Sequence, residues 1–212
     1  LLGIGIFSLR LLGSWLYIEF LIKSKLPIVS LVQSNLISNL KAHFGIKQEI
    51  NISESQHIQS PMLVGWLKTV ILFPVGVINQ LESEEIEAIL AHELAHLVRK
   101  DIWINVAQTM IEALLYYHPA IWWISTNIRV ERENCCDELA ISYTGDHIKY
   151  AKTLVKMQEL SLSNPALAMN FSKKNSFFAN RIKRILKMTQ TRNFLKEKII
   201  TSVILVLMVM FF

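Results

Sequence analysis

The run His-Glu-Leu-Ala-His at residues 92–96 constrains the fold of this chain more than any other feature. Histidines four positions apart lie on the same face of a helix, where both imidazoles can bind one Zn²⁺. Glu93 lies beside that face, so its carboxylate can reach a water on the metal without binding the metal itself. Zinc lowers the pKa of such a water toward neutrality, and Glu93 can take its proton as the water attacks a carbonyl. The run therefore predicts a helix that carries a hydrolytic site with one zinc per chain.

The residues around this run are those of an amphipathic helix. Ser83 is a suitable N-cap, and acidic residues follow it in the first turn, where they suit the helix dipole. Apolar side chains recur at helical spacing at Ile86, Ile89, Leu90, Leu94 and Leu97. Arg99 and Lys100 then suit the C-terminal end. The motif thus lies within a helix, as the chemistry requires.

A catalytic zinc has three protein ligands and a water, so the two histidines need a further partner. Glu133 and Asp137 are four positions apart and share a helix face. One carboxylate can bind zinc while the other hydrogen-bonds a ligating histidine and fixes its tautomer. The alternative is a charged helix held by salt bridges, which suits Glu131 beside Arg132. Glu131 is also the main rival for the ligand position.

Several motifs occur together here. Arg-Lys-Asp follows the run 92–96, Tyr-His-Pro-x-x-Trp-Trp occupies residues 117–123, and Glu-Arg-Glu-x-x-Cys-Asp occupies residues 131–137. With these motifs, and with the runs 60–65 and 70–74, the chain resembles the membrane metallopeptidases of the BlaR/MecR antirepressor type. The specific resemblance covers residues 46–148. The spacing from Glu133 to Asp137 is also similar to that in HtpX-like and CAAX-type membrane proteases, the nearest competing family.

The resemblance implies a gluzincin-like zinc endopeptidase that faces the cytoplasm. The implied metal ligands are His92, His96 and Glu133, with Glu93 as the base and Asp137 as a support for a ligand. In peptidases of this general fold a strand beside the zinc helix pairs with the substrate backbone, and residues 62–66 are our candidate for that strand.

The composition indicates a membrane setting, since 52% of the residues are hydrophobic. Residues 1–22 are long and apolar enough for a transmembrane helix, although Arg10 and Glu19 interrupt them. Residues 199–212 are apolar but too short to complete a second span. The chain begins without Met and stops within this run. We therefore expect it to be a piece of a longer membrane protein, with parts missing at both ends.

Basic residues lie beside both apolar segments, on the side of the intervening domain. Lys23, Lys25 and Lys41 follow the first segment, and a basic stretch from Arg181 to Lys198 precedes the second. Positive residues stay in the cytoplasm, so residues 23–198 are predicted to be cytoplasmic, in a multi-pass protein of the bacterial inner membrane. This topology explains the net charge of +5, and no nucleic-acid-binding motif accompanies it. Direct nucleic-acid binding is not expected.

The apolar stretch 102–124 must return on itself. A single crossing of the bilayer would separate His96 from Glu133 by roughly 30 Å, and the two could not share a metal. His118-Pro119 is the natural turn, because proline disfavours helix in the residue before it. We expect a helical hairpin at 101–127 that dips into the membrane interface, with the aromatic residues of 116–123 near its tip. Ordinary core packing of these aromatic residues is the alternative.

Strand signals are modest and fall at 46–53, 62–64 and 69–73. The predicted fold is therefore mainly α with a small β-sheet (α+β), a zincin-like HExxH metallopeptidase domain between transmembrane helices. After Asp137 we expect a helix at 147–160, a loop at 161–176 and a basic amphipathic helix at 177–187 on the membrane surface. Cys135 and Cys136 are adjacent, too close for a disulfide, and should be reduced thiols.

The residue that stabilises the transition state is less clear from the sequence. Arg181 is a candidate, because an arginine in a comparable position in HtpX-like enzymes contacts the substrate backbone or the oxyanion. His147 and Tyr150 follow the ligand helix and can also reach the site, although packing roles suit both.

Three functional hypotheses fit these observations. The first is an endopeptidase that cleaves a cytoplasmic or membrane-associated protein, with a transcriptional repressor as the substrate that the resemblance implies. The second is a housekeeping membrane protease of the HtpX or CAAX type. The third is a signalling scaffold in which zinc only stabilises the fold. Glu93 argues against the third, because a structural zinc site has no use for it.

Overall fold

The computed structural model describes residues 13, 16–27, 31–65, 69–162 and 171–187. The predicted second span, 199–212, lies outside the described residues, as does most of the first. Residues 16–23 of that first segment are helical. Among the described residues, no helix has both the length and the apolar character needed to cross a bilayer.

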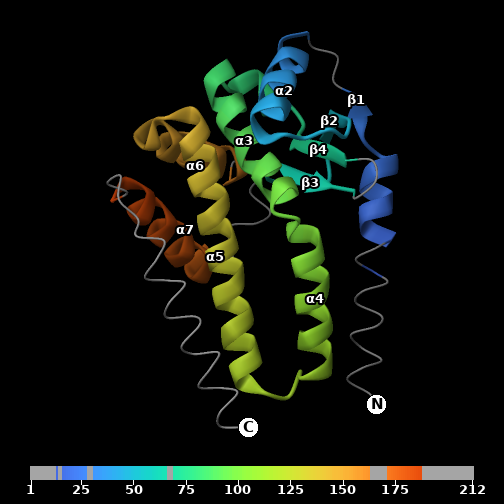
Figure 1. The fold of residues 1–212 in the computed structure, drawn as a ribbon, viewed down its shortest axis with the longest axis vertical. Coiled ribbons are helices and arrows are strands. Elements are labelled where there is room, and N and C mark those ends of the chain that lie inside the picture. The colour runs from blue at the N-terminus through green and yellow to red at the C-terminus, as the bar shows by residue number, and fades with distance from the viewer. Residues whose placement is uncertain (1–12, 14–15, 28–30, 66–68, 163–170, 188–212) are drawn as a thin grey trace.

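The sheet is small and mixed, with the strand order β1-β2-β4-β3 (Figure 1). Its strands are β1 (Leu26–Pro27), β2 (Ile50–Ser55), β3 (Met62–Val64) and β4 (Thr69–Pro74). β2 and β4 are parallel, whereas β1 pairs with β2 and β3 with β4 in the antiparallel sense. The three predicted strands are confirmed. β3 lies at the edge of the sheet, so one of its sides pairs with no strand among the residues that the structure describes.

β4 is buried throughout, and its alternate side chains pack into two hydrophobic clusters. Ile71 and Phe73 belong to the larger cluster, which also includes residues of α2 (Leu31–Phe44) and α3 (Ser83–Val98). Val70 and Leu72 pack with Leu21 on the other face of the sheet. The sequence analysis had not predicted α2. The short helix η1 (Ile78–Gln80) connects β4 to α3.

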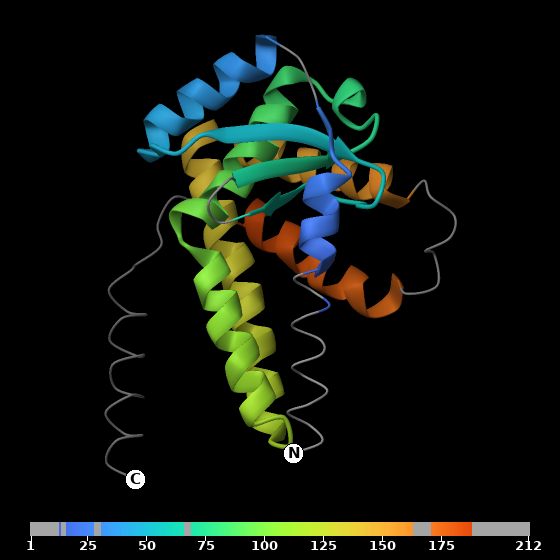
Figure 2. The ribbon, with the colours of Figure 1, turned by 90° about the vertical axis from the view of Figure 1, so that its right-hand side faces the viewer.

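The zinc-motif helix α3 lies at the centre of the molecule, between the sheet and α5 (Figure 2). Its N-cap is Glu82 rather than the predicted Ser83. The Glu82 side chain accepts a hydrogen bond from the backbone N–H of Glu85, and the backbone N–H of Glu82 donates to the Glu85 carboxylate at 2.8 Å. This reciprocal pair satisfies two backbone N–H groups that a serine cap alone would not. α3 ends at Val98 with Arg99 as its C-cap, and Lys100 has a left-handed backbone with φ 59°.

A helical hairpin projects from this body (Figures 1 and 2). It consists of α4 (Asp101–Leu114) and the first half of α5 (Pro119–Thr144). The chain reverses at residues 115–118, the place indicated by His118-Pro119. The indole N–H of Trp122 donates to the Tyr116 carbonyl at 2.8 Å across this turn. α5 continues without interruption into the motif 131–137, so one helix carries both the hairpin arm and Glu133.

Two further helices complete the described chain, α6 (His147–Leu162) and α7 (Phe171–Leu186). The loop predicted at 161–176 is therefore wrong at both ends, and residues 163–170 lie outside the described part. Local polarity suggested a loop, whereas the helices extend into it on both sides. α7 packs against α5 through Arg184, which donates to Glu138 and to the Asn134 carbonyl, each at 2.8 Å. The structure is mainly helical with a small mixed sheet, as predicted.

Candidate metal centre

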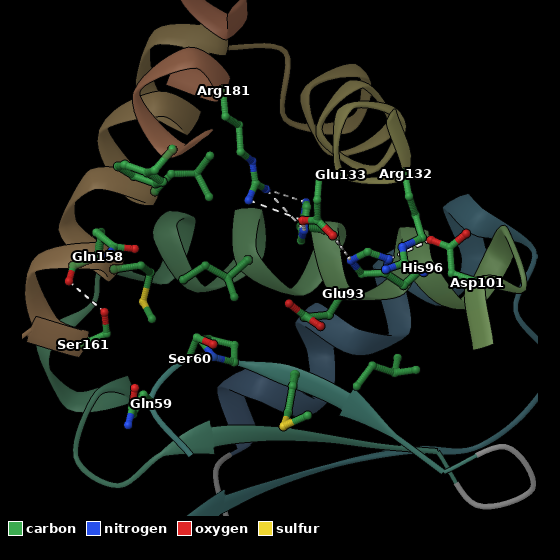
Figure 3. Close-up of a pocket in the computed structure, with 18 of the residues that line it drawn as sticks. Gln59, Ser60, Glu93, His96, Asp101, Arg132, Glu133, Gln158, Ser161 and Arg181 are labelled. Atoms are coloured by element: carbon green, nitrogen blue, oxygen red, sulfur yellow. Dashed lines mark hydrogen bonds and ion pairs between the residues drawn. The ribbon is translucent and has the colours of Figure 1, made fainter. Parts of the chain in front are cut away.

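His92, His96 and Glu133 each bring one donor atom to a common point, and these atoms lie within 4.8 Å of one another. Figure 3 shows His96 and Glu133 side by side at this point. The carboxylate oxygens of Glu133 are 3.5 Å from Nε2 of His92 and 3.8 Å from Nε2 of His96. The histidines lie on α3 and Glu133 on α5, so the hairpin return brings them together. Glu131, the rival ligand, is exposed and accepts a hydrogen bond from Asn134 at 2.8 Å. It is not part of the cluster.

Tyr150 holds His92 from behind. Its hydroxyl is 2.9 Å from Nδ1 of His92 and donates to Oδ1 of Asp137 at 2.7 Å. Because the hydroxyl donates to the carboxylate, it accepts the hydrogen on Nδ1, so the nitrogen of His92 that loses its proton to bind a metal is Nε2, which faces Glu133. Asp137 lies 3.3 Å from the same Nδ1. Tyr150 is only 1% exposed and is not among the residues that line the pocket, so it reaches the site through His92 and Asp137 from a packed position.

Asp101 holds His96 in the corresponding way, with Oδ2 2.7 Å from Nδ1 of His96. Asp101 is the first residue of α4, and the left-handed backbone of Lys100 turns the chain so that this carboxylate faces back toward α3. The sequence analysis missed this role. The available signal was Arg-Lys-Asp just after the zinc motif. His96 and Asp101 are five positions apart, a separation that does not place two residues on one helix face. Nothing in the sequence predicted the turn at Lys100 that brings them together.

Cys136 lies behind His96, with its sulfur 3.3 Å from Nδ1 of His96 and 3.5 Å from Oδ2 of Asp101. These three residues form a second group of metal-ligand types. In that group, however, the histidine would use Nδ1, which Asp101 already hydrogen-bonds. Burial and the Asp101 carboxylate both raise the pKa of the Cys136 thiol, so it stays protonated. Cys135 and Cys136 are both free thiols, as expected.

Arg181 of α7 lines the pocket, and two of its five N–H groups donate to Asp137. Its Nε and Nη2 atoms donate to the two oxygens of the Asp137 carboxylate at 2.8 and 2.6 Å. Its Nη1 atom lies 3.4 Å from Glu133. Asp137 is fully buried and accepts from both Arg181 and Tyr150. His147 is half-exposed at the start of α6 and does not line this pocket.

The electrostatics of the centre favour a cation between its carboxylates. Burial lowers the pKa of His92, but hydrogen bonds to Asp137 and Glu133 outweigh that effect and raise it to about 9. Burial raises the pKa of Glu133, and His92 and Arg181 outweigh it and lower the pKa to about 2. Without metal, a proton on His92 supplies positive charge to this centre. Two imidazoles and one carboxylate are also the donor set of many hydrolytic zinc sites, so these residues fit zinc.

Glu93 and the metal-centre residues line a pocket of about 630 Å³ (Figure 3). Glu93 is 8% exposed. Met62 and Leu63 of β3, part of the predicted substrate strand 62–66, form the wall opposite α5. The pocket is lined on its α6 and α7 side by Leu154, Met157 and Phe178. On its α4 side it is lined by Ile102 and Asn105.

Comparison with known proteins shows which family the chain resembles. A model of the family described as BlaR1 peptidase M56 matches residues 1–185. The regulatory protein BlaR1 of Bacillus licheniformis is 29% identical over 204 residues, which are 93% of this chain and 33% of that protein. The methicillin resistance mecR1 protein of Staphylococcus aureus is 30% identical over 143 residues, 66% of this chain and 24% of that protein.

A protease HtpX homolog of Saccharolobus islandicus is 39% identical over a shorter stretch of 54 residues, 26% of this chain and 16% of that protein. The chain spans about a third or less of the length of these relatives. The match to the family model covers most of the chain, including the zinc motif and the motif at 131–137. This chain belongs to the BlaR1 peptidase M56 family.

Proposed function

We propose that this chain is a zinc-dependent endopeptidase that acts in signal transduction of the BlaR/MecR type. Its substrate is a cytoplasmic or membrane-associated protein, with a transcriptional repressor as the first candidate. The observation that carries the proposal is the convergence of His92, His96 and Glu133 in a pocket that Glu93 also lines. Membership of a peptidase family supports the hydrolytic activity. The relatives' names, a regulatory protein and a methicillin resistance protein, support the signalling role.

In this proposal Nε2 of each histidine and the Glu133 carboxylate hold one Zn²⁺. When bound, the metal supplies a Lewis acid that acidifies water and polarises a peptide carbonyl. Glu93 takes the proton of the attacking water and passes it to the leaving amine. Tyr150 and Asp101 keep the hydrogen of each imidazole on Nδ1, so that Nε2 stays available.

The free side of β3 suits the substrate main chain. Strand addition at such an edge gives affinity through backbone hydrogen bonds, and side chains then fall alternately toward and away from the pocket. Met62 and Leu63 line the pocket on the side opposite α5. A peptide paired with β3 would therefore lie between this strand and the metal centre.

We further propose that the hairpin formed by α4 and α5 lies in the bacterial inner membrane, with the peptidase site on the cytoplasmic side. Its outer surface carries large apolar side chains, including Trp103, Leu114, Tyr117 and Trp123, with exposures of 56%, 66%, 69% and 70%. Its interior is polar, since Gln108, Glu112 and Ser125 are all buried between the helices. A hairpin in water buries apolar side chains and exposes polar ones. This hairpin has polar side chains inside and apolar ones outside, the arrangement that lipid favours.

One observation favours a second candidate function. The similarity to a protease HtpX homolog, 39% identity over 54 residues, supports a housekeeping membrane protease of the HtpX or CAAX type. The two functions differ in substrate range. A signalling peptidase cleaves one or a few proteins at defined bonds, whereas a housekeeping protease cleaves many damaged or lipidated proteins.

The decisive experiment pairs metal content with proteolysis for the wild type and Glu93→Gln in lipid nanodiscs, with host cytosolic and membrane proteins as substrates. We expect one zinc per chain in both proteins and cleavage by the wild type alone. Cleavage of a few proteins favours the signalling role, and broad cleavage favours the housekeeping role. Zinc without cleavage in either protein would favour a zinc-stabilised scaffold. The absence of zinc from both would refute the proposal.

A further inference from the structure

Two arginines line the pocket, and the structure gives them different surroundings. Arg181 is held by Asp137 and lies close to Glu133. Arg132 on α5 is half-buried, and among the described residues it makes neither a hydrogen bond nor an ion pair. The neighbour that the sequence suggested as its partner, Glu131, binds Asn134 instead. Within the described part of the chain, Arg132 is therefore the pocket guanidinium that forms no ion pair with a carboxylate.

Arg132 and Arg181 lie on different sides of the pocket. Arg132 and Arg181 approach the pocket on opposite sides of Glu133, and Arg132 extends on the side of His96 and Asp101 (Figure 3). Ile102 and Asn105 of α4 line the pocket on that side. The side lined by α6 and α7 is mixed: Leu154, Met157 and Phe178 lie there with the polar residues Gln158 and Ser161 and with Arg181, whose guanidinium Asp137 already binds. A peptide that lies across the centre thus meets a mixed surface, whose arginine is already paired with a carboxylate, at one end and the guanidinium of Arg132 at the other.

The charges around the pocket leave Arg132 without a counterpart. Asp137 is paired with Arg181, and Asp101 lies 3.5 Å from Arg99. The two remaining carboxylates, Glu93 and Glu133, together equal the charge of one divalent metal ion. A half-buried guanidinium with no such partner is poorly compensated, and it gains most from a carboxylate that arrives with a ligand.

We propose that Arg132 is a specificity-determining residue that binds an acidic side chain of the peptide substrate, on the side of the cleaved bond that faces α4. The inference depends on the proposed peptidase function and goes beyond it by naming a substrate feature. A planar guanidinium can hold a carboxylate through two parallel hydrogen bonds, which an amide of the same shape cannot match.

The test profiles cleavage of a proteome-derived peptide library by the zinc-loaded chain in nanodiscs. We expect wild-type cleavage sites to be enriched in Asp or Glu at one fixed position relative to the cut bond. Arg132→Gln should lose this enrichment, and Arg132→Glu should replace it with enrichment in Lys or Arg. For a peptide with Glu at that position, Arg132→Gln should lower kcat/KM at least about tenfold relative to the matching Gln peptide, as expected for a lost charge-assisted hydrogen bond.

Two variants control this result. Lys152→Gln removes one positive charge from an exposed position on α6 that does not line the pocket, and it should leave the enrichment unchanged. Arg132→Lys keeps the charge without the planar fork and should keep part of the preference. In the inactive Glu93→Gln background, the affinity for the Glu and Gln peptides measures the same preference without hydrolysis.

The failures of the two proposals differ in kind. If the wild type cleaves no peptide, the peptidase function itself is contradicted. If the wild type cleaves peptides without any acidic preference, or if Arg132→Gln slows acidic and amide peptides equally, Arg132 does not select an acidic side chain. An equal loss on both peptides would instead point to a contact with the substrate backbone.

Discussion

Hydrogen bonds to Nδ1 decide which nitrogen of each histidine faces a metal. Tyr150 does this for His92 and Asp101 does it for His96, each from an element other than α3. Such supporting residues set both the ring orientation and the basicity of a ligand. The metal centre is thus held by α3, α4, α5 and α6 together, rather than by the zinc motif alone.

Asp101→Asn should lower zinc affinity about 10- to 100-fold, because the amide holds the His96 ring with a weaker hydrogen bond than the carboxylate. Competition with a chromogenic chelator measures this change, and circular dichroism checks that the variant folds. Glu159→Gln, an exposed carboxylate on α6, is the matched control and should keep full affinity. An unchanged affinity in Asp101→Asn would show that Asp101 does not support the ligand.

Zinc binding should release a proton near neutral pH. His92 has a raised pKa of about 9 in the metal-free chain, so its imidazole carries a proton below that pH and zinc must displace it. The affinity for zinc should therefore rise about tenfold per pH unit as pH approaches 9. Calorimetry at pH 7 in buffers of different ionisation enthalpy measures the released protons. A binding enthalpy that does not depend on the buffer would contradict the raised pKa.

At the scale of single residues, the sequence was most informative where chemistry depends on local spacing. Glu133 and Asp137 were selected by their four-residue separation, and the structure places both at the histidines. Tyr150 was selected for its proximity to the ligand helix, with packing as the alternative, and its hydrogen bonds to His92 and Asp137 depend on how α6 packs. Asp101 and the free guanidinium of Arg132 depend on contacts between elements, which no local pattern reveals.

Among the secondary-structure elements, the hairpin has the most unusual interior. Gln108, Glu112 and Ser125 are buried, and Arg129 extends this cluster by pairing with Glu112. On α5, every residue from 122 to 131 except Ser125 is exposed. The helices of the hairpin therefore adhere through polar contacts, as expected where apolar surroundings provide little hydrophobic driving force between helices.

Glu112→Ala should destabilise the hairpin, because it leaves Arg129 and Gln108 without their carboxylate partner. The expected loss in the free energy of unfolding is about 1–3 kcal/mol, the cost of an unpaired buried polar group. Thermal unfolding in detergent, compared with Asn127→Ala on the exposed face, measures it. The double variant with Arg129→Ala should regain part of the loss, since no charge is then left unpaired. A double variant less stable than Glu112→Ala would contradict this account.

The elements that local patterns specify were the ones predicted. β2 follows from partial apolar alternation, β3 and β4 follow from short apolar runs, and the hairpin turn follows from proline at 119. α2 was missed because it is stabilised by packing on the core rather than by a clear local pattern. The loop at 161–176 was assigned from its polarity, although both neighbouring helices extend into it. Polar composition alone does not end a helix that packs on its neighbours.

The whole molecule consists of an α/β body with a projecting hairpin (Figure 1). We expect brominated lipids to quench the fluorescence of Trp123, which is 70% exposed at the hairpin tip. The fluorescence intensity that Trp123→Phe removes comes from this residue alone. Brominated lipids should quench that intensity more strongly than the aqueous quencher iodide does. Stronger quenching by iodide than by lipid would place the tip in water and contradict the proposed membrane setting.

α5 is a single helix from Pro119 to Thr144, so the hairpin tip and the third donor of the metal centre belong to one stiff rod. At a rise of 1.5 Å per residue, roughly 15 Å of helix separates Trp123 from Glu133. With the tip in lipid, a change in bilayer thickness shifts the rod along its axis, and Glu133 moves with it relative to the histidines on α3. Lipid composition would then change the distance between Glu133 and the two histidines, through the movement of one helix.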